Sequence, residues 1–186
     1  MLSLGALVPE LVAQGQVWRL LSSMFLHAGF AHLALNMISL YFLGSFIEEA
    51  FGRGRFLALY LLSGIAGGLA YLYFGAFDGA AVGASGAIFG LLGGVLGYSL
   101  GRGTFSWQNP IIRQLLILLA LNLYIGFSIP NISNTAHLGG LAGGVVFGWL
   151  VAPTVYSRKR LRSLSPVSVL LGAELVLLAL WFLYFA

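Results

Sequence analysis

Six long apolar runs divide the chain, and each has the length of a helix that crosses a bilayer. Such a helix needs ~20 mostly apolar residues, and the runs cover residues 28–47, 55–77, 82–101, 111–130, 134–152 and 167–185. The alternating pattern of a membrane β-barrel is not seen, whereas helices satisfy every backbone group in lipid. The pattern therefore predicts an all-α polytopic membrane protein, a helical bundle with six transmembrane helices.

The same pattern divides the chain into four parts. Residues 1–27 are too short and too broken by polar residues to span a bilayer, so they are expected to form an outer loop segment before the first span. Residues 28–152 hold five spans and form the predicted core. Residues 153–166 are a basic loop, predicted to be cytoplasmic, and residues 167–186 an additional C-terminal transmembrane helix.

Composition indicates that lipid is the main solvent of this chain. Of its 186 residues, 60% are hydrophobic and 8% charged, whereas about 25% of residues in soluble domains are charged. The absence of cysteine excludes disulfides and thiol chemistry. The net charge of +4 does not indicate nucleic-acid binding, because the charges lie at the ends of the apolar runs.

The basic residues predict the orientation of the spans. Eight of the nine lie in connections that share one side, namely Arg53, Arg55, Arg102, Arg113, Arg158, Lys159, Arg160 and Arg162. The other side holds Arg19 alone. Because cytoplasmic loops carry an excess of Lys and Arg, these connections are expected in the cytoplasm and both chain termini outside.

Four polar residues from three spans share one predicted depth. Spans one, three and five all enter from the outer side, and His32, Asn36, Ser85 and His137 lie in their first turns. With a rise of ~1.5 Å per residue, all four lie ~5–12 Å from the outer boundary. Polar groups are costly at such a depth and are therefore often functional.

Small residues recur at every fourth position in the third and fifth runs. In the third run they form two rows, Gly86, Gly90 and Gly94, and Gly93, Gly97 and Gly101. In the fifth run one row consists of Ala136, Gly140, Gly144 and Gly148, and Gly139 and Gly143 lie next to it. Such stripes let helix backbones approach closely in lipid. General membrane packing explains the deeper glycines, but packing along both stripes would also bring Ser85 and His137 together.

Ser85 and His137 are the residues expected to react. A serine hydroxyl becomes a nucleophile when a base takes its proton, and imidazole is the usual base at neutral pH. No Asp or Glu lies at their depth to orient the imidazole as in a triad. Phe89, one helical turn below Ser85, could stack on the ring and hold it instead.

Acyl transfer also needs hydrogen-bond donors for the oxyanion. Asn36 offers an amide NH2, His32 lies one turn away on the same face, and the Ser85 N–H has no partner in the first turn of a helix. Gly83 and Gly86 keep the surroundings of the serine open to a substrate backbone.

Simpler interpretations compete with this one. A lone serine in a transmembrane helix usually bonds its own backbone. A metal site of His27, His32 and His137 is disfavoured, because no H-E-x-x-H pair and no carboxylate accompany them; His27 is expected to cap or brace the outer loop. No metal or cofactor is predicted. Glu174 is expected to be a packing or interface residue, and the context of Asn122 assigns it no role.

Five motifs, in order along residues 5–152, resemble those of the rhomboid family of intramembrane serine proteases, in a bacterial-type form. They are Trp18-Arg19, His27-Ala-Gly-Phe-Ala-His32-Leu-Ala-Leu-Asn36, Glu48-Glu-Ala-Phe-Gly52, Gly83-Ala-Ser85-Gly86 and Ala136-His137-Leu-Gly-Gly140. The resemblance implies a rhomboid-like bundle that cuts transmembrane substrate proteins near the outer membrane face, in a bacterial plasma membrane.

The resemblance also implies roles for the residues. Ser85 would be the nucleophile and His137 the base, with Asn36, His32 and the Ser85 N–H forming the oxyanion hole. Trp18, Arg19, Gly83, Gly86 and Phe89 would support the site. Tyrosine is common where this chain has Phe89, and the loss of the hydroxyl keeps the stack.

Two other functions compete with proteolysis. A catalytically impaired relative would bind transmembrane segments and escort them, but such relatives lack the dyad whose two members are present here. A transporter would place its polar residues near the midplane, whereas here they lie near one face. The expected partners are transmembrane protein substrates and membrane lipids, not nucleic acids.

The chain departs from the family pattern at its beginning. The family's first helix precedes the Trp-Arg loop, but only seventeen residues precede Trp18. The six spans would then be family helices two to six and an extra C-terminal helix. We expect an apolar run of ~20 residues encoded just upstream of Met1. The helix it would form would cover one side of the active-site cavity and would help the polar first span to insert into the membrane.

The 186-residue form is accordingly predicted to be less stable than a form with this preceding helix. Thermal unfolding in detergent, with and without an added first helix, measures the difference. Equal unfolding temperatures would show that six spans suffice, and an in-frame stop codon directly before Met1 would count against the upstream run.

Overall fold

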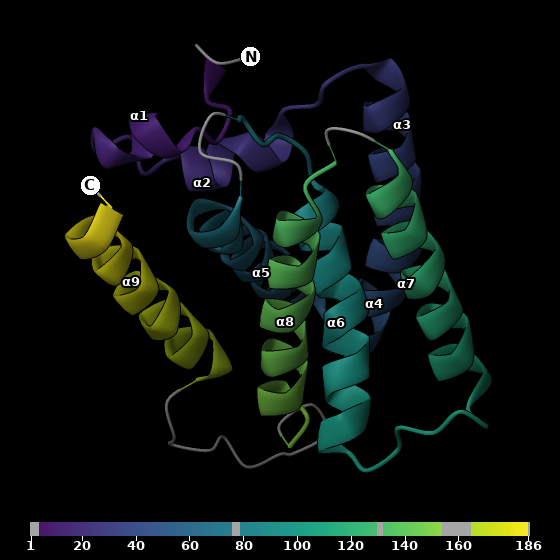
Figure 1. Ribbon diagram of the computed structural model, residues 1–186. Coiled ribbons are helices and arrows are strands. Elements are labelled where there is room, and N and C mark those ends of the chain that lie inside the picture. Colours follow the sequence, from purple (N-terminus) through teal and green to yellow (C-terminus); the bar gives the residue numbers. More distant parts are fainter. Residues whose placement is uncertain (1–3, 76–78, 130–131, 154–164, 186) are drawn as a thin grey trace.

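The computed structural model describes residues 4–75, 79–129, 132–153 and 165–185 as a bundle of helices (Figure 1). The elements are α1 (Pro9–Ala13), α2 (Arg19–Ser22), a 3₁₀ turn (Ser23–Phe25), α3 (Phe30–Ser39), α4 (Ser45–Phe51), α5 (Arg53–Phe74), α6 (Ser85–Gly101), α7 (Pro110–Ser128), α8 (Asn134–Val151) and α9 (Pro166–Phe185). Within these ranges, strand-type pairing is confined to one bridge between Leu7 and Ala81.

The first predicted span is one continuous helix with an irregular middle. A π-helical turn, Leu40–Gly44, joins α3 to α4, so that the helix runs from Phe30 to Phe51. The sequence pattern predicts an end at residue 47, just before the acidic pair, but Glu48 and Glu49 continue the helix. Gly52 ends it with a φ of 82°, a value that favours glycine.

The other five predicted runs also coincide with helices, and their ends agree within about three residues, the accuracy expected of such boundaries. The prediction of a helical bundle is therefore confirmed. Among the residues that the structure describes, four helices are long and apolar enough to cross a membrane, namely 30–51, α5, α7 and α9. α6 is a shorter apolar helix of 17 residues, and the first turn of α8 is polar.

The centre of the bundle is a close contact of α6 with α8, and α5 packs against both (Figure 1). Along this contact the glycines of each helix lie on backbone carbonyls of the other. A Cβ at Gly140, Gly144 or Gly148 would overlap the carbonyl oxygen of Gly86, Gly90 or Gly94, and a Cβ at Gly93 or Gly97 would overlap that of Leu141 or Val145. The predicted stripes therefore face one another.

The remaining long helices lie on opposite sides of this centre (Figure 1). α9 packs on α5 and α8, where the buried Trp181 donates a hydrogen bond to the Leu72 carbonyl at 3.0 Å. α7 has few contacts with α6 and α8. α1 and α2 lie over the end of the bundle where α6 and α8 begin.

The described basic residues lie at the connections that the topology prediction used. Arg53 and Arg55 lie in the first turn of α5, and Arg102 and Arg113 flank the connection between α6 and α7. Arg158, Lys159, Arg160 and Arg162, with most of the predicted loop 153–166, lie outside the described residues.

We predict that the glycine contact contributes measurably to stability. Gly144→Ala should lower the free energy of unfolding by about 1–3 kcal/mol, because its Cβ has to displace the Gly90 carbonyl. Gly172→Ala in α9 is the matched control, since an added Cβ there meets nothing within 4 Å. Thermal unfolding in detergent compares them, and a Gly144→Ala protein as stable as the wild type would refute the prediction.

Candidate active site

Ser85 and His137 meet at the start of the central helix contact. Ser85 is the first residue of α6, and His137 lies in the first turn of α8. His137 Nε2 and Ser85 Oγ are 2.8 Å apart, within hydrogen-bond distance. The imidazole is buried, whereas the serine is only half-buried. The stacked glycines below this pair hold the two helices close enough for the contact.

Phe89 fixes the plane of the imidazole. Its ring stacks on that of His137, with the ring centroids 4.3 Å apart and the planes 8° from parallel. His137 Nδ1 is buried and bonds to no atom of the described residues. With no carboxylate partner described, aromatic stacking and the Ser85 contact orient the ring.

His32 and Asn36 lie on α3, on the other side of Ser85. The Asn36 side chain is buried, and its Nδ2 donates a hydrogen bond to the His32 carbonyl oxygen at 2.8 Å. An amide nitrogen carries two hydrogens, so one N–H remains for another acceptor. The His32 Nδ1 accepts a hydrogen bond from the Ala28 N–H at 3.3 Å.

At Gly83 the backbone passes close to both His32 and Ser85. Its φ is 127°, a value unfavourable for other residues. A Cβ at this position would lie 2.9 Å from His32 Nε2 and 3.7 Å from Ser85 Oγ. A side chain at this position would therefore overlap the His32 ring, and only glycine lets the chain pass this close to His32 and Ser85. Gly86 instead faces α8, where a Cβ would lie 3.3 Å from the Ala136 carbonyl oxygen.

His27 packs beside His32. The two rings meet edge to face at 5.3 Å, and the buried His27 Nε2 bonds to no described atom. Within the described ranges, no three His, Asp or Glu side chains are grouped so that they could hold a metal ion.

The backbone before Ser85 is held by the N-terminal segment of the chain. Leu7 and Ala81 exchange two backbone hydrogen bonds, from Leu7 N to Ala81 O at 3.0 Å and from Ala81 N to Leu7 O at 2.9 Å. The Gly83 N–H donates to the Ser23 carbonyl oxygen at 2.9 Å. These bonds fix the path of the four residues that lead into α6.

Arg19 and Ser22 in turn hold the segment that contains Leu7. The buried Arg19 donates from Nη1 to the Ala6 carbonyl oxygen and from Nε to Gln16 Oε1, both at 2.8 Å. Ser22 Oγ donates to the Gly5 carbonyl oxygen at 2.8 Å. Arg19 thus holds the backbone of this segment near the site. Trp18 is largely exposed. The sequence pattern did not indicate Ser22, Ser23 or Leu7, because bonds between distant backbone segments leave no periodic signal.

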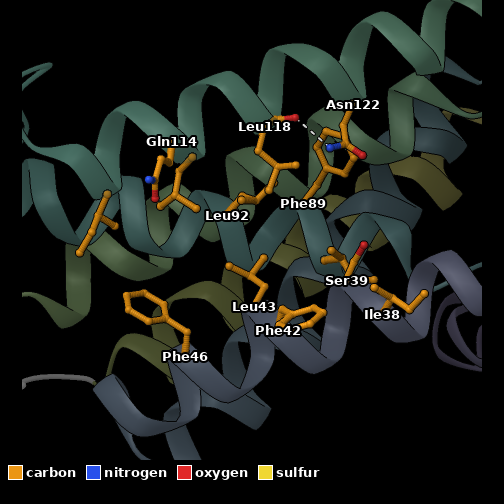
Figure 2. A pocket seen from close by; sticks show the side chains of 13 residues that line it. Ile38, Ser39, Phe42, Leu43, Phe46, Phe89, Leu92, Gln114, Leu118 and Asn122 are labelled. Atoms are coloured by element: carbon orange, nitrogen blue, oxygen red, sulfur yellow. Dashed lines mark hydrogen bonds between the residues drawn. The ribbon is translucent and has the colours of Figure 1, made fainter.

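An apolar cavity of about 440 Å³ extends from beneath the dyad along the side of the bundle. It lies between the helix 30–51 and α7, over the face of α6 (Figure 2). Phe89 lines it, so the residue that stacks on His137 also forms a wall of the cavity. Three polar side chains, Ser39, Gln114 and Asn122, are among its otherwise apolar lining.

Comparison with known proteins places this chain in one family. The rhomboid domain matches residues 14–154. The chain is 38% identical over 144 residues to rhomboid protease GluP of Bacillus subtilis (strain 168), a match that covers 77% of this chain. It is 42% identical over 150 residues to RHOMBOID-like protein 5 of Arabidopsis thaliana, covering 80% of this chain. The chain belongs to the rhomboid family.

The matched relatives are mostly longer than the region they share with this chain. The match spans 28% of GluP and 48% of RHOMBOID-like protein 5. YdcA of Bacillus subtilis (strain 168), 40% identical over 139 residues, is matched over 69% of its length and 75% of this chain. The family and the apolar helices identify the chain as an integral, polytopic helical membrane protein.

Proposed function

We propose that this protein is an intramembrane serine endopeptidase that cleaves transmembrane substrate proteins. The observation that carries the proposal is the 2.8 Å contact between His137 Nε2 and Ser85 Oγ in a buried, aromatic-walled site. Membership of a family whose relatives include a named rhomboid protease supports the reaction class.

The chemistry follows from the placement of the two groups. Ser85 Oγ attacks the scissile carbonyl carbon while His137 Nε2 takes the hydroxyl proton. The C–N bond then breaks, and His137 returns the proton to the leaving amine. Water, deprotonated by the same imidazole, releases the acyl group from Ser85. The face of Phe89 against the imidazole favours the protonated ring that forms in each half-reaction.

The oxyanion is assigned to donors on both sides of the serine. The Ser85 N–H is at the first position of α6, where no helical acceptor exists. The second N–H of Asn36 and the Nε2 of His32 are the side-chain donors, and His32 Nε2 lies against the Gly83 backbone, two residues before Ser85. Donors held in advance at a developing charge lower the barrier without reorganisation.

The backbone near Ser85 suggests how a substrate is aligned. Leu7 uses both backbone groups of Ala81. In an extended segment the N–H and C=O groups of the neighbouring residues, Ala80 and Val82, point to the opposite edge. A substrate strand can pair there, next to the nucleophile. The rest of the substrate's transmembrane segment would then lie in the apolar cavity between the helix 30–51 and α7.

We further propose six membrane spans and an outward-facing site. α6 and α8 pack along their lengths with α5, which is itself long enough to span, so all three are assigned to the same layer. The excess of basic residues at the opposite end supports a site near the outer face. A bacterial plasma membrane is the proposed location, in keeping with the relatives from Bacillus subtilis.

Replacing either member of the dyad by alanine should abolish cleavage of a model transmembrane substrate while the protein still folds. Ser85→Ala removes the nucleophile and His137→Ala its base, and the double variant should be no worse than either single one, because the pair acts as a unit. Cleavage is measured with purified protein in lipid vesicles.

Ser63→Ala is the matched control for this experiment. Ser63 is a fully buried serine of the same bundle, and its Oγ bonds to no described atom. This variant should retain activity. Substantial cleavage of the substrate by the Ser85→Ala protein would show that Ser85 is not the nucleophile.

Asn36→Ala should lower kcat by about 10–1000-fold with little change in KM, the range for the loss of one oxyanion donor. The donor acts on charge that develops only in the transition state, so substrate binding is largely spared. Steady-state kinetics with the same substrate separate the two constants. A change confined to KM would instead make Asn36 a residue that binds the substrate.

A further inference from the structure

Asn122 lies in an apolar cavity at about the depth of the dyad. It precedes the last residue of α7, Ser128, by six residues, or about 9 Å along the helix. Asn122 and Phe89 line the same cavity, and Figure 2 shows both side chains at the same end of it. Phe89 is one helical turn below Ser85, so Asn122 lies close to the point where a substrate would be cut.

The amide of Asn122 keeps hydrogen-bonding capacity after its contact within α7. Nδ2 donates to the Leu118 carbonyl oxygen at 2.8 Å (Figure 2). This leaves one N–H and the whole of Oδ1, and neither bonds to any group in the part of the chain that the structure describes. An amide with unmet capacity is costly in an apolar surrounding.

Two other polar residues of α7 show what is particular about Asn122. Ser128 uses its one hydroxyl proton to donate to the Tyr124 carbonyl oxygen at 2.7 Å, and it does not line the cavity. Gln114 lines the cavity but lies only one turn from the start of α7, toward the basic end of the bundle. Asn122 alone among the three combines the depth of the dyad with a place in the cavity.

We propose that Asn122 selects transmembrane substrates that carry a hydrogen-bonding side chain about one helical turn on the membrane side of the cleaved bond. The partner residue is Asn, Gln, Ser or Thr, which can pair with Oδ1 or with the second N–H. This inference rests on the proposed function, because it assigns the cavity to the substrate segment. The pairing satisfies two polar groups that would otherwise stay unpaired in an apolar site.

The proposal is tested by binding, separately from cleavage. Two transmembrane peptides of the same sequence, with either Asn or the isosteric Leu one turn below the cleavage position, are titrated against the Ser85→Ala protein in vesicles. The polar residue is moved over three successive positions to find the register. At one position the Asn peptide should bind about 3- to 30-fold more tightly, the range for one hydrogen bond in a membrane.

The same titrations with Asn122→Leu in the Ser85→Ala background identify the residue responsible. The preference should disappear, because Leu has nearly the same shape and no hydrogen-bonding group. It should persist with Ser128→Ala, which removes a polar group of α7 outside the cavity. Asn122→Ser, which replaces the amide with a small hydrogen-bonding hydroxyl, should retain part of the preference and is the alternative variant if the Leu variant does not fold.

Three results would overturn the inference. They are equal binding of both peptides at all three positions, a preference that survives Asn122→Leu, and an equal loss of affinity for both peptides in that variant. The last would assign Asn122 to the substrate main chain. Cleavage by the protein with Ser85 intact is measured in parallel, so a failure of the proteolytic function is seen separately from a failure of the selection.

Discussion

The close approach of α6 and α8 is the constraint on which the candidate site depends. Each helix places glycines on the backbone carbonyls of the other, leaving no room for a Cβ along the contact. The hydrophobic effect does not drive helices together in lipid, so close van der Waals packing of this kind has to hold them. Because Ser85 and His137 both lie in first turns at the same end of the contact, their 2.8 Å separation is set by the packing beneath them.

A site inside an apolar helical bundle has to satisfy its polar groups with few partners. The bundle does so with local hydrogen bonds: Asn36 bonds the His32 carbonyl, and His32 accepts from the Ala28 amide. The imidazole of His137 is held by an aromatic face instead of a carboxylate. This arrangement avoids burying a charge that has no counter-ion, which is expensive in an apolar medium. The N-terminal segment adds backbone hydrogen bonds at Ala81 and Gly83 that fix the path of the chain into Ser85.

Features with a regular spacing could be predicted from the sequence, and features without one could not. The apolar runs gave the six long helices, and the glycine stripes gave the α6–α8 contact and with it the meeting of Ser85 and His137. The stack of Phe89 followed from its position one turn below Ser85. The π-helical turn in the first span, the Leu7–Ala81 bridge and the serine bonds behind it depend on contacts between distant segments. The cavity that contains Asn122 depends on how loosely α7 is packed, which no local pattern records.

The central claim is that His137 makes the Ser85 hydroxyl nucleophilic. The most direct measurement is covalent labelling of membranes that contain the protein with a fluorophosphonate probe, which reacts with activated serines and needs no knowledge of the substrate. The account predicts labelling of the wild-type chain at Ser85, no labelling of Ser85→Ala, and strongly reduced labelling of His137→Ala, in which the serine remains but its base is gone. Labelling of His137→Ala at the wild-type rate, or its absence from a folded wild-type protein, would contradict the account.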